Sequence, residues 1–236
     1  YLGITSWEAT ASGNPSLKSL AGKVTELTPM PQRKTGASYD ETIVLNAALE
    51  AAVRDLFSHT GPTGQRALDA VARRLQTEAT DGKPADVVER SMAYGQSVAA
   101  HILAWSQTDG GATVENMGFP VSMELPKGPG LWVPTSAIRQ QQLPLLPAWG
   151  KNRLLALPDS NACGLPPPPA YSEESGSTFH KEALEVYETT KALTDEQKLI
   201  ARFWSDDPML TPTPPGHWIA IVLQIAERDS LTVDRT

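Results

Sequence analysis

The segment from 39 to 57 constrains the fold most, because it is apolar around almost its whole circumference. Between Ile43 and Arg54 the only polar residues are Asn46, Glu50 and Arg54, at four-residue spacing, so they form a narrow polar stripe on a helix. Such a helix needs partners on most of its sides, and we expect it in the middle of a helical bundle, with its alanines allowing close approach. The apolar positions are Ile43, Val44, Leu45, Ala47, Ala48, Leu49, Ala51, Ala52 and Val53.

Two further helices are predicted directly after this one, at 65–79 and 84–107. Pro84 suits the first turn of the later helix, and Asp86 lies near the positive end of its dipole. Short connections between consecutive helices favour an antiparallel bundle. The expected buried faces are Leu68, Val71, Ala72 and Leu75 in the first helix and Val88, Met92, Gly95, Ala99, Ile102 and Trp105 in the second.

The first 38 residues and the middle of the chain lack this periodicity. Residues 1–38 are rich in glycine, proline and small polar residues, which predicts an extended N-terminal arm before a bundle that occupies 39–236. In the middle, eleven of the 20 prolines lie between Pro120 and Pro169. Proline removes backbone donors, so 108–177 is expected to be irregular. Its tryptophans and leucines indicate an ordered wrap across the helices rather than a solvated linker.

The segment ends in a run of four prolines, Pro166–Pro169. We expect a polyproline spacer or part of the wrap there, with a docking motif for a proline-binding module as the alternative.

Helical signals return between 178 and 228. They predict helices at 178–191, 195–205 and 217–227, and Thr194 with Gln197 forms a capping box before the second of these. The apolar run 218–226 contains β-branched residues, which leaves a strand as the competing prediction. Taken together, the helical signals along the chain predict an all-α fold. It is a helical bundle with a long proline-rich irregular wrap and no sheet of more than two short strands.

Charge and cysteine content exclude several classes of protein. The net charge is −7 and the basic residues are scattered, which argues against a nucleic-acid surface. No run of 18 apolar residues exists, so no membrane span is expected. Cys163 is the only cysteine, which excludes an internal disulfide and a cysteine-based zinc cluster; a buried or unreactive thiol is expected.

Localisation stays open, and Tyr1 in place of a methionine slightly favours export.

Several motifs occur together in an order found in one family. They are Ser91-Met92-Ala93-Tyr94-Gly95, Trp105-Ser106-Gln107-Thr108-Asp109, Pro147-Ala148-Trp149-Gly150, Pro166 to Ser172, Phe203-Trp204-Ser205-Asp206 and Pro215-Gly216-His217-Trp218. This order resembles the vanadium-dependent haloperoxidases, helical proteins related to the type 2 phosphatidic acid phosphatases. The resemblance covers roughly 35–228, corresponds to the N-terminal half of that family, and favours a helix over a strand at 218–226.

The resemblance implies an oxyanion site that this sequence does not carry. The family holds the oxyanion with a Lys ahead of an Arg-Pro, a Pro-Ser-Gly-His loop and a later Arg with a His, and none of these occurs here. At the nearest similar segment, Pro215 replaces the serine. His217 is the candidate nucleophilic or metal-binding histidine, but we prefer the interpretation that Pro215 and Gly216 form a turn and His217 starts a helix. No catalytic, cofactor-binding or metal-binding residue is therefore assigned.

Other candidate residues are weaker. His59, His101, His180 and His217 form no metal-binding pair by spacing, and His101 is expected to be a hydrogen-bonded interior or boundary residue. The pairs Asp206 with Asp207 and Glu173 with Glu174 could bind a hard cation, but solvated helix ends are the expected outcome. The scattered cations Arg90, Lys151, Arg153 and Arg202 would need to converge in space to hold an oxyanion.

Two functional classes follow from the sequence. The first is the non-catalytic half of an enzyme that oxidises halides with peroxide or hydrolyses phosphate esters, in which vanadate or phosphate is held only when the missing half is present, on another segment or a second chain. The second is a helical interaction or scaffold protein that has lost the chemistry. We expect this chain alone to be inactive, with a homo-oligomer as a further possible assembly. Phe203, Trp204 and Trp218 are expected to form an apolar cluster between the last two helices.

Overall fold

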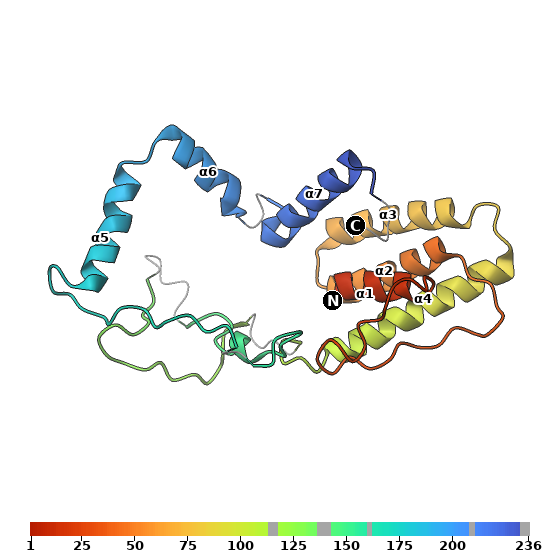
Figure 1. The fold of residues 1–236 in the computed structure, drawn as a ribbon, viewed down its shortest axis with the longest axis horizontal. Coiled ribbons are helices and arrows are strands. Elements are labelled where there is room, and N and C mark those ends of the chain that lie inside the picture. Colours follow the sequence, from red (N-terminus) through yellow and green to blue (C-terminus); the bar gives the residue numbers. More distant parts are fainter. Residues whose placement is uncertain (113–117, 136–142, 160–161, 208–210, 232–236) are drawn as a thin grey trace. The chain divides into compact units, whose positions relative to one another are not determined.

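The structure, a computed structural model, is all-α in the residues that it describes, and no strand occurs in them (Figure 1). The described residues are 1–112, 118–135, 143–159, 162–207 and 211–231. They form two compact units, the first made of Tyr1–Glu124 and Pro134–Gly164 and the second of Leu125–Val133 and Leu165–Thr236. The predicted fold class is confirmed. The helices of the first unit are α1 (Leu2–Ala11), α2 (Glu41–Leu56), α3 (Pro62–Thr80) and α4 (Ala85–Ser106), followed by a 3₁₀ helix at Trp149–Lys151.

Helix α2 lies in the middle of the first unit and contacts α1, α3 and α4, as its nearly uniform apolar surface predicts (Figure 1). Val44 and Ala48 of α2 pack with Val98 and Ile102 of α4, and all four side chains are fully buried. Burial of a large aliphatic side chain contributes about 1.5–3 kcal/mol, so this contact is a main source of stability for the unit.

Helix α1 differs from the sequence prediction, which placed residues 1–38 in an extended arm. Residues 2–11 are helical and pack on α2 and α4, with Ala9 in the core. The carboxylate of Glu8 is 1% exposed and accepts hydrogen bonds from the Ser19 hydroxyl at 2.8 Å and the Leu20 amide at 2.5 Å. A buried carboxylate needs such donors, and they come from the segment that follows the helix. The tertiary contacts therefore stabilise a helix that local sequence does not signal.

Helix α3 is less buried than its periodicity predicts. Of the expected face, only Ala72 is buried, while the side chains of Val71 and Leu75 are 47% and 37% exposed. The helix therefore stands against α2 with part of its apolar face uncovered.

The proline-rich middle forms no α-helix in its described residues. Part of it belongs to the first unit and contacts the segment between α1 and α2: the amide and hydroxyl of Thr25 donate to the carbonyl of Leu155 at 2.9 and 3.1 Å. Arg153 forms an ion pair with Glu26 at 2.9 Å in the same region.

The second unit contains α5 (Thr178–Lys191), α6 (Asp195–Ser205) and α7 (Thr213–Arg228). The capping box of Thr194 and Gln197 is present, as predicted. Helix α7 begins four residues before the predicted 217, so Pro215 and Gly216 lie in its first turn rather than in a preceding turn. Prolines are tolerated there because the first amides of a helix have no intrahelical partner. Pro208, which follows Asp206 and Asp207 in the sequence, lies outside the described residues.

No helix among the described residues is long and apolar enough to cross a membrane.

Candidate functional site

The histidine and aspartate at the α6–α7 junction form the most chemically organised group in the second unit. Asp206 follows the last residue of α6 in the left-handed conformation, with φ of 46°, and is 7% exposed. Nδ1 of His217, in the first turns of α7, lies 2.9 and 3.0 Å from the two carboxylate oxygens of Asp206. A carboxylate that pairs with Nδ1 fixes the orientation of the imidazole ring. The second ring nitrogen, Nε2, takes no part in this contact.

Aromatic rings surround this pair. The His217 ring stacks on Trp204 with centroids 5.0 Å apart, and it meets Phe203 edge-on at 4.7 Å. Trp204 also contacts Phe203 at 5.0 Å and Trp218 at 6.0 Å. The predicted aromatic cluster is present, but His217 is at its centre, and the residues Phe203, Trp204 and Trp218 remain 56%, 50% and 59% exposed.

The pairing of Asp206 with His217 was not predicted from the sequence. Asp206 was expected to be a solvated helix end, which is wrong because its carboxylate is buried. The available signal was an aspartate at the end of one helix and a histidine at the start of the next, with aromatic residues beside both. Eleven positions and a proline-rich connection separate them, so spacing alone does not bring them together.

Two of the four basic residues that were candidates for holding an oxyanion form other contacts in the structure. Arg90 donates to the Asp86 carboxylate and to the carbonyl of Ser38, both at 2.6 Å. Arg153 pairs with Glu26 and donates to the carbonyl of Trp105 at 3.0 Å. Two of the four candidates, Arg90 and Arg153, are thus already paired with carboxylates.

Arg153 instead belongs to a polar cluster that fastens the end of α4 to the wrap. The Tyr1 hydroxyl donates to Asp109, and the Arg153 amide donates to the Asp109 carbonyl at 2.7 Å. Burial, and then the hydrogen bond to the Asp109 carboxylate, raise the pKa of Tyr1 to about 12. The Trp105 indole donates to the Thr25 carbonyl at 3.1 Å, so the cluster also holds the segment before α2. Its role is structural.

The remaining candidates do not form a site. No group of three or more His, Cys, Asp or Glu side chains that could hold a metal occurs among the described residues. Nε2 of His101 lies 3.0 Å from the Thr28 hydroxyl, as expected for a hydrogen-bonded boundary residue. Glu173 accepts a hydrogen bond from the Tyr171 hydroxyl. Cys163 is exposed, so of the two expected states the buried thiol is wrong, and the unreactive thiol stays a prediction.

A scan against protein-family models gave no match, and a search of curated proteins gave none either. Among solved structures, the chain matches one described as the first bacterial vanadium-dependent iodoperoxidase, with a TM-score of 0.73 and 26% sequence identity. The chain shares its fold with this iodoperoxidase. The match covers 98% of this chain and 54% of the iodoperoxidase chain, so this chain spans about half the length of that protein.

Proposed function

We propose that residues 1–236 are the non-catalytic N-terminal half of a protein that resembles the vanadium-dependent haloperoxidases or the related acid phosphatases. In this proposal the oxyanion site is supplied by a segment outside these residues, on the same polypeptide or on a partner chain. The observation that carries the proposal is the match to the iodoperoxidase over 98% of this chain but only 54% of the other.

The exposed apolar surface of the second unit supports this proposal. None of the side chains of α5, α6 or α7 is buried, and Leu199, Leu223 and Trp218 are 67%, 60% and 59% exposed. Each large apolar side chain that becomes fully buried stabilises an assembly by about 1.5–3 kcal/mol. A further segment that packs against these helices would gain this stabilisation and would complete the unit.

The state of the cationic residues supports the assignment of the oxyanion site to that other segment. Vanadate and phosphate carry several negative charges and require converging cations and hydrogen-bond donors. Arg90 and Arg153 form ion pairs with Asp86 and Glu26, so these pairs would have to break before either arginine could bind an oxyanion. With vanadate bound, the complete protein would oxidise halides with peroxide; without redox chemistry, the same kind of site would hydrolyse phosphate esters.

The alternative function is a helical interaction or scaffold protein that has lost the chemistry. The exposed side chains of α6 and α7 favour it, since they present aromatic and aliphatic groups, including Phe203, Trp204 and Ile219. Large apolar patches of this kind mark protein-binding surfaces.

One set of experiments separates the two functions. Intact-mass measurement of the source material, with a search for a copurifying chain that contains Pro-Ser-Gly-His, tests whether a second segment exists. Isothermal titration with vanadate, bromination assays, phosphatase assays and metal analysis then compare the 236-residue chain with the same chain plus that segment. We expect no binding and no turnover by the chain alone, and both after the segment is added. If the assembly neither binds vanadate nor turns over substrate, the scaffold function is favoured. Stoichiometric vanadate binding by the isolated chain would refute the proposal that another segment supplies the oxyanion site.

A further inference from the structure

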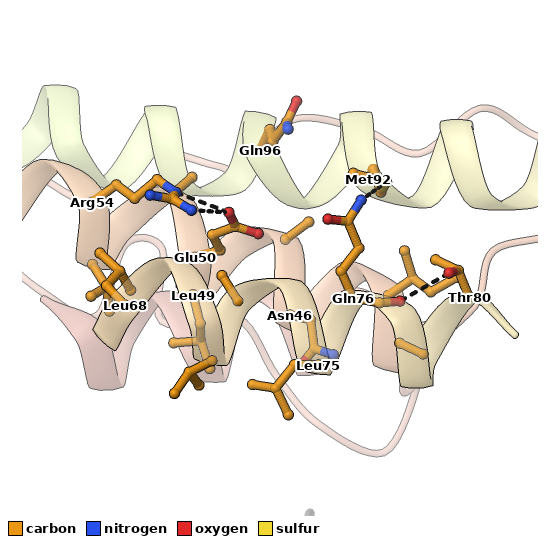
Figure 2. Close-up of a pocket in the computed structure, with 17 residues that line it drawn as sticks. Asn46, Leu49, Glu50, Arg54, Leu68, Leu75, Gln76, Thr80, Met92 and Gln96 are labelled. Atoms are coloured by element: carbon orange, nitrogen blue, oxygen red, sulfur yellow. Dashed lines mark hydrogen bonds and ion pairs between the residues drawn. The ribbon is translucent and has the colours of Figure 1, made fainter. Parts of the chain in front are cut away.

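A pocket of about 580 Å³ lies between α2, α3 and α4 in the first unit (Figure 2). Its walls are mainly apolar, with Leu49, Leu68 and Leu75 beside several small alanines. The pocket exists because α3 buries only Ala72, so its remaining apolar side chains face the gap rather than a neighbouring helix. Small-molecule sites are mostly apolar and typically measure about 300–1,000 Å³, so both the size and the lining suit a ligand.

The charged groups of the pocket neutralise each other. Glu50 and Arg54 are its only charged lining residues within the described part of the chain, and their side chains pair at 2.9 Å. Arg54 also pairs with Asp69 at 2.8 Å, and Asp69 in turn lies in the field of Arg73, so two cations balance the two carboxylates; the hydrogen bond from Arg54, and then the charges of Arg54 and Arg73, lower the pKa of Asp69. An ionic ligand group would find no free counter-charge, and a charge without a partner is costly to remove from water. The lining therefore favours a neutral ligand.

Neutral hydrogen-bonding groups lie toward the other end. Figure 2 shows Arg54 and Leu68 toward one end of the pocket and Gln76 and Thr80 toward the other. The Gln76 amide donates to the Met92 sulfur at 3.7 Å. A thioether is a weak acceptor, so the amide would form a stronger hydrogen bond with a ligand oxygen in its place. Asn46 is half-buried, and its side chain has no hydrogen-bond partner among the described residues. One end of the pocket thus offers amide groups to a polar atom.

The length of the pocket suits an elongated molecule. Asn46 and Arg54, which both line it, are eight positions apart on α2, which corresponds to roughly 12 Å at 1.5 Å per residue.

We propose that this pocket binds a neutral, elongated amphiphile, with an aliphatic or aromatic body along Leu49, Leu68 and Leu75 and one hydrogen-bonding end group beside Asn46 and Gln76. All the lining residues belong to the first unit. The inference is therefore independent of the oxyanion site in the proposed function.

The test uses the 236-residue chain and the neutral fluorescent dye N-phenylnaphthylamine, with decanol as a competitor. Ala51→Leu on α2 and Ala79→Leu on α3 fill the pocket from opposite walls, and Ala70→Leu adds the same side chain to an exposed position of α3 outside the lining. We expect either filling variant to weaken dye binding about tenfold or more, because added methylenes occupy the space of the ligand. Ala70→Leu should bind the dye as the unchanged chain does. Decanol should displace the dye more strongly than decanoate or decyltrimethylammonium.

Several results would contradict the proposed site for a neutral ligand. Equal dye affinity in both filling variants, with helix content and urea midpoint retained, places the dye elsewhere. Stronger displacement by either ion contradicts a neutral ligand. If both variants fail to fold, NMR amide shifts of the unchanged chain titrated with decanol decide: shifts along α2, α3 and α4 support the site, and shifts absent there refute it. Self-association that Ala79→Leu abolishes, without dye binding by the unchanged chain, assigns the pocket to side chains of a second copy and also refutes it.

Discussion

Gly95 of α4 lies so close to Val44 of α2 that a Cβ atom on residue 95 would be 2.3 Å from the Val44 carbonyl oxygen. The same Cβ would approach the Ala47 Cβ and the Ala48 amide nitrogen at 3.0 Å. Both sides of this contact are helix backbone or a short side chain, which cannot move aside without shifting a whole helix. The closest approach of the two central helices therefore depends on a residue without a side chain.

We expect Gly95→Ala to destabilise the first unit by about 1–3 kcal/mol, the usual cost of overpacking a tight core. The matched control is Gly3→Ala in α1, where a Cβ meets no atom within 4 Å. That change should be neutral or stabilising by up to about 1 kcal/mol, because alanine favours a helix over glycine. Urea unfolding followed by circular dichroism measures both. A Gly95→Ala variant as stable as the unchanged chain would show that the helices are free to separate.

Asp40 is expected to stabilise α2 in a pH-dependent way. Its side chain accepts hydrogen bonds from the amides of Thr42 and Ile43 and pairs with Lys83 at 2.7 Å. The hydrogen bond from Lys83, followed by those from the backbone, outweighs burial and lowers the Asp40 pKa. A lowered pKa in the folded state gives stability that is present above the unfolded value of about 3.9 and is lost as pH falls through the folded value.

The test compares Asp40→Asn, which keeps a capping acceptor without the charge, with Asp40→Ala, which removes both. At neutral pH, Asp40→Ala should cost about 1 kcal/mol or more through loss of the helix cap, and Asp40→Asn should cost less. The gap between Asp40→Asn and the unchanged chain should close as pH falls from about 7 to about 3. A gap that widens toward acid would contradict the direction of the pKa shift.

Arg33 should not be replaceable by lysine. Its guanidinium forms two hydrogen bonds of 2.6 Å with Glu41 and lies over the rings of Tyr39 and Tyr94, with centroid distances of 4.8 and 4.9 Å. Lysine keeps the positive charge, but it lacks the planar guanidinium that forms the two hydrogen bonds to Glu41 and stacks on the tyrosine rings. We expect Arg33→Lys to lower the free energy of unfolding by about 1–2 kcal/mol. Arg74→Lys is the control: its ion pair with Glu78 is 3.8 Å long and mostly exposed, so the change should be close to neutral.

Asp206 should be the residue that holds the α6–α7 junction. Asp206→Ala removes the His217 hydrogen bonds and places an unsuitable residue at a φ of 46°, so we expect a loss of about 1–3 kcal/mol. Asp206→Asn should retain most of the stability, since asparagine tolerates this conformation and keeps an acceptor. The neighbouring Asp207 is exposed, and Asp207→Ala serves as the control. Unfolding monitored by tryptophan fluorescence compares the three, because Trp204 and Trp218 are two of the six tryptophans that contribute to the signal. Equal effects at 206 and 207 would mean that the buried pair is not important.

Local sequence determined most of the helices. The periodicity of 39–57 and the capping box of Thr194 and Gln197 act within one or two turns, so they predict α2 and α6 without any knowledge of the rest of the fold. The central place of α2 followed from the same pattern, because a helix that is apolar on nearly all sides must be covered. Gly95 was expected on the buried stripe of α4, but its contact with Val44 was not.

Only the tertiary structure decided the features that join distant residues. Helix α1 forms because Glu8 finds donors at Ser19 and Leu20 and Ala9 enters the core, although its glycine and polar residues favour an arm. The Asp206–His217 pair depends on how the chain between α6 and α7 folds, and the pocket beside α3 depends on how far that helix stands from α2. Helix formation depends mainly on neighbours three and four residues away, whereas a binding site depends on the relative positions of whole helices, which no local pattern encodes.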